Sequence, residues 1–485
     1  MLFSSLPFLI FFAVYFTLHL LVPSRWRTFL IIAGSTIFYG YWDWRFTPLP
    51  FMLLAVASLG ASWMDRTASQ SSRKWRLAFV VSLLLLPLLF FKYANFLYRD
   101  VYLPFFPAPV SEPISLVGPF DLSVTFFPSP DKVISTVLPL GISFITFTFI
   151  GYVADIYRRV EGEERLEHLT SAVMFFPHLI AGPVVLPKQL VWQMKRPPVS
   201  ASEKQWRGAA LIFAVGLFKK LVLADQIALA VNPVFRDPGS WTAPDYLLAV
   251  FGFSMQIYCD FSGYSDMAVG ISRFLGVRLP KNFERPYLSA SPAEFWQRWH
   301  ISLSSWLRNY LYIPLGGNRC GLGRQIFNIM ITMALGGLWH GARWTFVVWG
   351  VAHGAAIAIT HVLRRFRGAS PSGAPKEFAV VAVFLFVTIT WIPFRAESLS
   401  EAWRVLSGCF SAPLGNLEAF ASKNAFFLGL LAFFFLTHRY DNLVRIRAFA
   451  RKSSPELGWM AAMMIFVVAA AFGLGGSAEF IYFDF

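Results

Sequence analysis

Long apolar segments recur along this chain, and they limit its fold more strictly than any other feature. Leu77–Phe91 consists almost purely of Leu, Val and Phe, and Leu6–Val22 contains a single histidine, His19. A helix needs about 20 mostly apolar residues to cross the hydrocarbon of a bilayer. Segments of this kind therefore predict helices that lie in lipid.

About a dozen segments fit this span rule. They are Leu6–Val22, Phe29–Trp42, Leu49–Met64, Leu77–Phe91, Val133–Tyr152, Ala209–Leu223, Tyr246–Tyr258, Ile326–Trp339, Trp344–Val362, Phe378–Trp391, Ala425–Thr437 and Trp459–Phe472. Several are near the short end of the range, so we expect some to be re-entrant or interfacial. The chain is predicted to be an all-α, polytopic integral membrane protein, and we interpret residues 1–485 as one membrane domain. Within it we expect N-terminal helices in 1–135, a motif-bearing core in 136–362 and C-terminal helices in 363–485.

Composition supports the membrane assignment. Hydrophobic residues make up 56% of the chain and charged residues only 14%, against roughly 25% in soluble domains. The formal net charge of +15 would suggest nucleic acid in a soluble protein. Here no basic domain stands apart and no nucleic-acid-binding motif is present. Basic loops that face anionic lipid explain the charge, so we expect membrane lipids rather than nucleic acid as its partner.

The distribution of basic residues in the early loops predicts the orientation. Arg25 and Arg27 follow the first apolar segment, and clusters at 66–76 and 158–165 follow the third and fifth, whereas 101–131 is nearly free of Lys and Arg. Cytoplasmic loops carry the excess of positive charge. We therefore expect the N-terminus on the periplasmic side of a bacterial inner membrane. The first segment lacks a basic leader and a cleavage site, so we interpret it as a permanent helix.

Cysteine usage offers no metal or disulfide framework. Cys259, Cys320 and Cys409 lie far apart, and no CxxC pair occurs. We expect neither a metal site nor a tightly bound cofactor.

The richest polar stretch is Phe295–Asn318, which follows a capping sequence, Ser291-Pro292-x-Glu294. Its spacing predicts one short amphipathic helix at the membrane interface. The apolar stripe is Trp299, Leu303, Trp306 and Tyr310, and the polar face beside it is His300, Ser304 and Arg308. Periodicity alone favours an interfacial anchor, which leaves a histidine beside the aromatic stripe unexplained.

A second histidine, His340, lies between two apolar segments and is flanked by Gly336, Gly337 and Gly341. Glycines allow a backbone or a substrate to come close. Histidine suits general-base chemistry near neutral pH. The alternative is a histidine hydrogen-bonded where two helices meet. His353, one segment further on, is interpreted as structural.

Two further polar stretches have simpler interpretations. Asp260 and Asp266 interrupt an apolar segment, and pairing with Lys or Arg is favoured over proton relay. The prolines and glycine of Met174–Pro187 predict a re-entrant or broken element that lines a cavity, with His178 satisfied inside it. The glycine-rich segment Gly316–Gly323 could hold an anion, but no predicted strand precedes it.

Four sequences together resemble the membrane-bound O-acyltransferase (MBOAT) family, in particular its alginate O-acetyltransferase branch. They lie at Pro139–Arg158, Phe175–Val185, Tyr258–Arg319, which includes WHISLS, and Leu335–Gly341, which reads LGGLWHG. The resemblance covers roughly residues 1–400 and is densest over 139–360. Cys320, directly after GGNR, departs from the pattern.

The resemblance implies a ring of about a dozen transmembrane, re-entrant and interfacial helices around a central tunnel. It implies transfer of an acetyl group from cytoplasmic acetyl-CoA, across the membrane, to hydroxyls of an exopolysaccharide such as alginate. It matches the two catalytic histidines of the family with His340 and His300. It also implies a separate periplasmic SGNH-type acetyltransferase as partner, because this chain contains no such domain.

In the implied mechanism, His340 accepts the proton of the attacking hydroxyl, and His300 either orients that hydroxyl or donates to the oxyanion. A closed tunnel would keep water from the thioester. Weaker candidates for substrate or donor binding are Ser304, Arg308, Arg319, Arg324, Asp260 and Trp339.

Three alternatives stay open at this point. The acyl group could be D-alanine or a fatty acyl chain, delivered to another cell-envelope substrate. The chain could be a proton-coupled transporter, although no inverted repeat is visible. It could also be a non-catalytic scaffold of a polysaccharide export complex.

Overall fold

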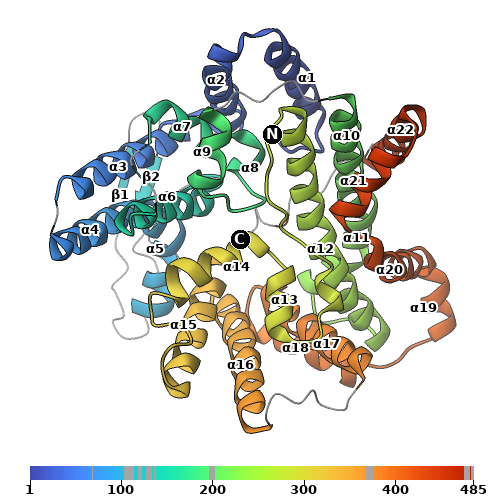
Figure 1. The fold of residues 1–485 in the computed structure, drawn as a ribbon. Coiled ribbons are helices and arrows are strands. Elements are labelled where there is room, and N and C mark those ends of the chain that lie inside the picture. The colour runs from blue at the N-terminus through green and yellow to red at the C-terminus, as the bar shows by residue number, and fades with distance from the viewer. Residues whose placement is uncertain are drawn as a thin grey trace. The chain divides into compact units, whose positions relative to one another are not determined.

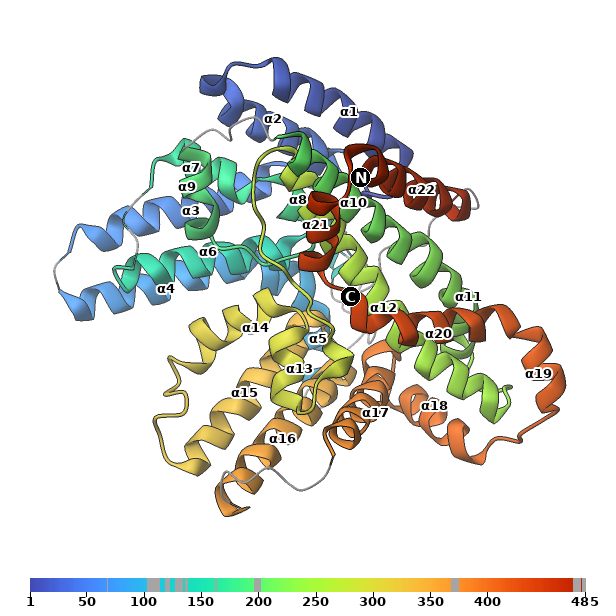
Figure 2. The ribbon, with the colours of Figure 1, turned by 45° about the vertical axis from the view of Figure 1, so that its right-hand side comes forward.

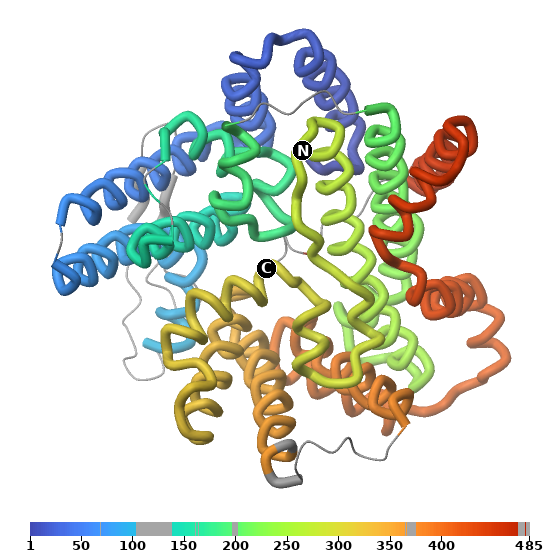
Figure 3. Tube along the Cα trace, viewed as in Figure 1, coloured from blue at the N-terminus to red at the C-terminus, as the bar shows by residue number. Residues whose placement is uncertain are grey.

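Helices dominate the structure, a computed structural model, as Figure 1 shows. The residues described are 1–67, 69–102, 114–117, 123–126, 134–135, 138–160, 162, 164–195, 202–367, 375–473 and 481. Figure 3 traces these segments along the chain from blue to red. The prediction of a helical, polytopic protein is confirmed, with one small sheet added. The ring and the central tunnel stay predictions.

The chain divides into two compact units. The first comprises residues 7–200 with Met1 and 275–277, and the second comprises 2–6, 201–274 and 278–485. The division into 1–135, 136–362 and 363–485 stays a prediction.

The first unit contains the helices of the N-terminal third and the sheet. Its elements are α1 (Leu6–Leu21), α2 (Arg27–Gly40), α3 (Pro48–Asp65), α4 (Gln70–Leu88), α5 (Ala94–Phe96), β1 (Ile114–Val117), β2 (Ser123–Phe126), β3 (Ile134–Ser135), α6 (Ile142–Tyr157), α7 (Leu166–Val173), α8 (Phe176–Leu179) and α9 (Pro187–Lys195). The strands pair antiparallel in the order β1-β2-β3, with Ile114 opposite Phe126 and Phe126 opposite Ile134. The sheet precedes α6, so this helix starts at Ile142; the predicted segment began at Val133, and residues 133, 136 and 137 lie outside the described residues.

A buried arginine joins the helices of the first unit. Arg73 of α4 donates to the carbonyl oxygens of Ile156 at 2.8 Å and Tyr157 at 3.2 Å, at the end of α6. It also donates to the carbonyl of Met64, at the end of α3, at 3.2 Å. The final carbonyls of a helix lack internal donors and carry partial negative charge, which a guanidinium satisfies. One side chain therefore fixes the ends of two neighbouring helices.

The second unit holds every residue of the candidate site. Its elements are α10 (Glu203–Phe218), a π-helical segment (Lys219–Ala224), α11 (Asp225–Arg236), α12 (Ala243–Phe274), α13 (Pro292–Arg298), α14 (Ile301–Leu307), a π-helical turn (Arg308–Tyr312), α15 (Leu322–His340), α16 (Trp344–Arg367), α17 (Lys376–Arg395), α18 (Leu399–Ser411), α19 (Leu417–Lys423), α20 (Ala425–Thr437), α21 (Leu443–Lys452) and α22 (Pro455–Gly473). Helices α10 and α12 lie side by side, as do α15 and α16, in both views of Figures 1 and 2.

Fewer helices meet the length and composition of a membrane span than the apolar segments suggested. Among the described residues five do: Trp44–Asp65, Gln70–Tyr102, Trp344–Leu363, Lys376–Arg395 and Pro455–Gly473. A sixth is reached if α19 and α20, bent by 74°, count as one broken span. Helices α1 and α6 are apolar but only 16 residues long. These shorter helices agree with the expectation that some segments are not complete crossings.

Apolar side chains face outward along several helices. On α22, Met460, Met463 and Met464 are each more than 60% exposed, and on α1 Leu6, Ile10 and Val14 are exposed. The recurrence at three or four residues is that of one helical face. A soluble protein rarely exposes such contiguous apolar faces, whereas a lipid-facing helix requires them.

Two adjacent lysines carry a buried charge cluster in the second unit. Lys219 lies 2.7 Å from both Asp266 and Asp441. Lys220 lies 2.9 Å from Asp225 and 3.0 Å from Asp260. Burying an ion away from water is costly unless an opposite charge and hydrogen bonds replace its hydration. The pairing that the sequence favoured for Asp260 and Asp266 is therefore present. Asp260 also accepts the backbone N–H of Ile481 at 2.8 Å.

Candidate active site

His340 ends α15 at the point where this helix is packed most closely against α16. A Cβ atom added at Gly337 would overlap the carbonyl oxygen of Phe346, and one added at Gly350 would overlap that of Met333. Only glycine lets the two backbones approach so closely. Gly337, which the sequence singled out beside His340, and Gly350 thus allow this helix pair to pack closely just before the histidine.

Aromatic rings surround His340, whose exposed fraction is 3%. Its ring centroid lies 4.9 Å from that of Trp339, 5.2 Å from that of Trp349 on α16 and 5.2 Å from that of Phe394 on α17. All three contacts are edge-on, the arrangement that aromatic rings prefer over face-to-face stacking. The imidazole is therefore held in a rigid, water-poor enclosure.

The single helix predicted over Phe295–Asn318 is wrong. Helix α13 ends at Arg298, Trp299 is extended, and His300 adopts the left-handed conformation with φ 42° before α14 begins at Ile301. The preceding loop causes the break. The N–H of Glu284 donates to the carbonyl of Arg298, and the N–H of Ile301 donates to the carbonyl of Asn282, both at 2.9 Å. These bonds replace the helical ones.

The predicted start of this segment is confirmed. The Ser291 hydroxyl accepts the N–H of Glu294 at 3.2 Å, and Pro292 occupies the first helical position. Sequence periodicity therefore located the beginning of α13 but not its end. A non-glycine residue in the left-handed region costs roughly 1–2 kcal/mol, and such strain is concentrated at functional sites.

The break turns His300 into the same enclosure as His340. The His300 side chain is fully buried, and its ring centroid lies 4.7 Å from that of Phe261 on α12 and 6.4 Å from that of His340. Trp339 contacts both histidines, at 5.9 Å from His300 and 4.9 Å from His340. The structure thus brings together two histidines and a tryptophan that the sequence singled out.

A cavity of about 930 Å³ lies beside α13, α14 and α15. Ser304, Arg308 and Arg319, predicted to bind substrate or donor, all line it, together with Cys320. Both arginines are exposed, and neither forms an ion pair with a carboxylate in the described ranges. Two guanidinium groups without such an ion pair at one cavity can bind an anion such as a phosphate.

The remaining predicted residues have other neighbours. Arg324 is absent from the described residues that line the cavity, and its guanidinium lies 5.2 Å from the centroid of the Phe327 ring. Asp260 belongs to the charge cluster of Lys220. Two aromatic rings stand between the cavity and His340. Trp296 lines the cavity and its centroid is 5.5 Å from that of Trp349, which contacts His340.

His353 has a structural place, as interpreted from the sequence. The indole N–H of Trp296 donates to its Nδ1 at 3.3 Å, and its Nε2 is 3.0 Å from the hydroxyl of Thr390. The Thr390 hydroxyl donates to the carbonyl of Val387 at 2.8 Å. The chain of donors satisfies both ring nitrogens and ties α13, α16 and α17 together.

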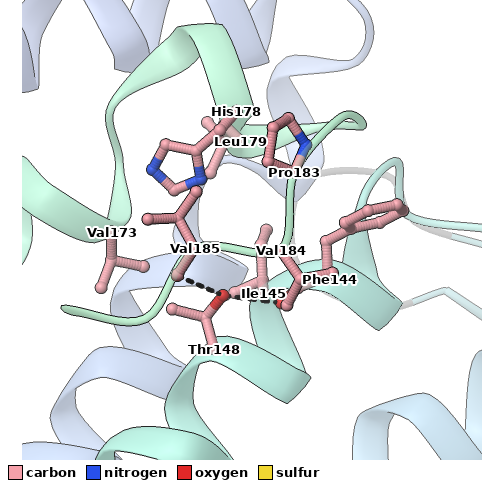
Figure 4. A pocket seen from close by; sticks show the side chains of 9 residues that line it. All are labelled: Phe144, Ile145, Thr148, Val173, His178, Leu179, Pro183, Val184 and Val185. Carbon is pink, nitrogen blue, oxygen red and sulfur yellow. Dashed lines mark hydrogen bonds between the residues drawn. The ribbon is translucent and has the colours of Figure 1, made fainter. Parts of the chain in front are cut away.

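The broken element predicted at Met174–Pro187 is confirmed in the first unit. Helix α8 has only four residues, Phe176–Leu179, and His178 Nε2 lies 2.9 Å from the carbonyl oxygen of Ala172. Figure 4 shows the narrow cleft around it, with the Thr148 hydroxyl donating to the carbonyl of Phe144 at 2.9 Å. The cleft has no room for a water molecule. His178 is therefore a satisfied core histidine.

Comparison with known proteins agrees with this geometry. The sequence pattern of MBOAT, the membrane-bound O-acyltransferase family, matches residues 173–395. The chain is 39% identical to the Probable alginate O-acetylase AlgI of Azotobacter vinelandii over 425 residues, 85% of this chain and 78% of the relative. It is 35% identical to the protein of that name from Pseudomonas aeruginosa over 471 residues, 92% of this chain and 84% of the relative. The chain belongs to the MBOAT family.

A third relative extends the range of acceptors. The Peptidoglycan O-acetyltransferase of Helicobacter pylori is 32% identical over 421 residues, 80% of this chain and 74% of the relative. This MBOAT protein is thus a multi-pass membrane O-acyltransferase, and both buried histidines lie inside the matched range. Family membership favours an enzyme over the transporter and scaffold alternatives.

Sequence reasoning missed three residues of this MBOAT site. Trp349 and Phe394 enclose His340, but each looks like an ordinary aromatic residue of an apolar span. Asn282 contacts His300, yet it lies in an irregular loop where no periodicity applies. The one available signal was that Asn282 lies in the same family-like stretch as His300.

Proposed function

We propose that this enzyme transfers an acetyl group from cytoplasmic acetyl-CoA across the bacterial inner membrane toward hydroxyl groups of an exopolysaccharide such as alginate. The names of its relatives support an acetyl group and a glycan acceptor. The observation that carries the proposal is the pair of buried histidines, 6.4 Å apart between ring centroids, in an aromatic enclosure next to a cavity whose two arginines form no ion pair within the described part of the chain.

The proposed reaction uses His340 as the general base. A hydroxyl is a weak nucleophile at neutral pH, so His340 takes its proton as the oxygen attacks the thioester carbonyl. A carbon–oxygen bond forms and the carbon–sulfur bond breaks. The departing thiolate receives the proton from His340, which restores the base. The aromatic enclosure excludes water that would otherwise hydrolyse the thioester.

We assign donor binding to the cavity. Arg308 and Arg319 would bind phosphate groups of acetyl-CoA, and Ser304 would add a hydroxyl donor. Arg324 is the weaker candidate because it stacks over Phe327 outside the cavity lining. The acceptor side would be served by a separate periplasmic SGNH-type acetyltransferase.

The test is acetyl transfer in inverted membrane vesicles supplied with radiolabelled acetyl-CoA, comparing wild type with His340→Ala at matched expression. We expect transfer to fall by on the order of 10²–10⁴-fold, the usual contribution of a general base. His168→Ala is the matched control, because this histidine lies on α7 in the first unit beside Glu167. Undiminished transfer by His340→Ala would refute its role. Label transfer from D-alanyl or fatty acyl donors in place of acetyl-CoA would refute the acetyl assignment.

A further inference from the structure

Asn282 makes a set of hydrogen bonds around the left-handed turn at His300. Its Oδ1 accepts the N–H of Ser302 at 3.2 Å and the Ser302 hydroxyl at 2.8 Å. The same oxygen lies 3.2 Å from His300 Nδ1. Its Nδ2 donates to the hydroxyl of Ser265 on α12 at 3.4 Å. Asn282 is 2% exposed, so these bonds lie inside the protein.

These partners determine which end of the amide faces His300. A backbone N–H can only donate, so the atom that Ser302 N–H meets must be an acceptor. The carboxamide oxygen is therefore on the side of His300 and Ser302, and the amide nitrogen is on the side of Ser265. A rotated amide would set two donors against each other at Ser302.

The orientation of the amide fixes the tautomer of His300. The Asn282 oxygen cannot donate, so a hydrogen bond to His300 Nδ1 requires the proton on Nδ1. In a neutral imidazole the other nitrogen, Nε2, then has a free lone pair. Nε2 of His300 is buried and makes no hydrogen bond to any residue that the structure describes. A buried, unsatisfied acceptor in a native protein calls for a ligand or a functional explanation.

We propose that Asn282 is a positioning residue that holds His300 as the Nδ1–H tautomer, so that Nε2 accepts a hydrogen bond from a hydroxyl of the substrate that neighbours the one His340 deprotonates. This inference rests on the proposed function, whose site it refines. It decides between the two roles left open for His300. A nitrogen that carries a lone pair orients the substrate by accepting from its neighbouring hydroxyl, and it cannot donate to the oxyanion. Asn282 also accepts from Ser302 and Ile301, so it supports both the ring and the strained backbone of His300.

Nitrogen-15 NMR of the full-length protein labelled at histidine reads the tautomer directly, without substrate. The His300 signals are assigned by their loss in His300→Gln. We expect a protonated Nδ1 and an unprotonated Nε2 in wild type and in Asn282→Asp, whose carboxylate also only accepts. Asn282→Ala should lose this signature. A wild-type His300 with the proton on Nε2 would overturn the proposal.

Steady-state kinetics test the positioning role of Asn282 independently of the NMR measurement. Asn282→Ala should lower kcat by on the order of 10²-fold and leave the KM for acetyl-CoA unchanged. Asn282→Asp should recover most of that loss and move the pH optimum upward, because a carboxylate favours the imidazolium and the base form then needs a higher pH. Asn424→Ala is the matched control, since Asn424 is also a buried asparagine and bonds to Phe420 at the α19–α20 junction.

The outcomes separate this inference from the proposed function. Wild-type kcat in a folded Asn282→Ala would refute the positioning role. If Asn282→Ala does not fold, the wild-type tautomer and the pH profile of Asn282→Asp still decide. Absence of acetyl transfer by the wild type would refute the proposed function and leave the tautomer measurement valid.

Discussion

Replacing Gly350 by alanine tests whether the close contact of α15 and α16 positions His340. The added Cβ would overlap the carbonyl oxygen of Met333, and both atoms belong to helix backbones, so no flexible side chain can yield. Carbon–oxygen contacts are normally about 3.3–3.6 Å, so the helices must separate by roughly 1 Å. Overpacking of this kind costs about 1–3 kcal/mol, and the better helix propensity of alanine returns at most about 1 kcal/mol. We expect a net loss of stability.

The same displacement should reach the chemistry. Trp349 precedes Gly350 and contacts His340, so a shift of α16 moves one wall of the enclosure. A misplacement of about 1 Å can lower a rate by on the order of 10²-fold. The assays are thermal unfolding in detergent, followed by tryptophan fluorescence, and acetyl transfer in vesicles. Gly429→Ala is the control, because a Cβ on this α20 glycine meets nothing within 4 Å. A Gly350→Ala protein with wild-type stability and transfer would refute the reasoning.

Three further predictions use other parts of the molecule. Arg308→Ala and Arg319→Ala should each raise the KM for acetyl-CoA roughly tenfold, because each loses a charged hydrogen bond to the donor. Arg324→Ala should leave the KM near the wild-type value. Equal effects of the three variants in steady-state kinetics would contradict the cavity assignment. Lys219→Ala removes the lysine that pairs with Asp266 and Asp441, and it should lower the free energy of unfolding by about 3–5 kcal/mol. Lys204→Ala, at an exposed lysine, should change it little. Similar thermal unfolding curves for the two variants would refute the stabilising role of the charge cluster. Burial raises the pKa of Glu284, but the hydrogen bond from Lys281 and the charges of Lys281 and Arg285 lower that pKa by more. The net pKa therefore lies below the ordinary glutamate value of 4.5. The ionised Glu284 side chain therefore stabilises the folded protein fully above about pH 4.5, and this contribution is lost as the pH drops through the pKa of the folded state. Glu284→Gln should flatten the acid side of a plot of unfolding free energy against pH. An unchanged acid side would refute this prediction.

The sequence was sufficient wherever one dominant physical signal controlled the structure. Apolar length located most helices, since lipid requires apolar faces and internally bonded backbones. The capping sequence at Ser291 predicted the start of α13, because the cap is a local hydrogen bond between residues of the same four-residue segment. His300 and His340 were found because ionisable groups in apolar surroundings are uncommon and costly.

The break at His300 was beyond local reasoning. Periodicity continued from Trp299 through Tyr310, while the bonds that end α13 come from Asn282 and Glu284 in the loop that precedes α13. Tertiary hydrogen bonds overrode the helical pattern there. Asn282 escaped notice for the same reason, since its role depends on where its loop is placed. The separation of Arg319 from Arg324 likewise follows from the turn between them, which the glycine-rich composition did not specify.

The pairing of Lys219 with Asp441 has a consequence for biogenesis. The two residues are 222 positions apart, so at about 5–20 residues per second the lysine waits roughly 10–45 s for this carboxylate to be synthesised. During that interval Asp266 is its earliest available counter-charge. Lys220 can be neutralised sooner, by Asp225 and Asp260, although Asp260 receives the N–H of Ile481 only after a further 221 residues. Three carboxylates therefore already face the two lysines before Asp441 is made, so Asp441 adds no missing charge and instead ties a late segment of the chain to a cluster that can form earlier.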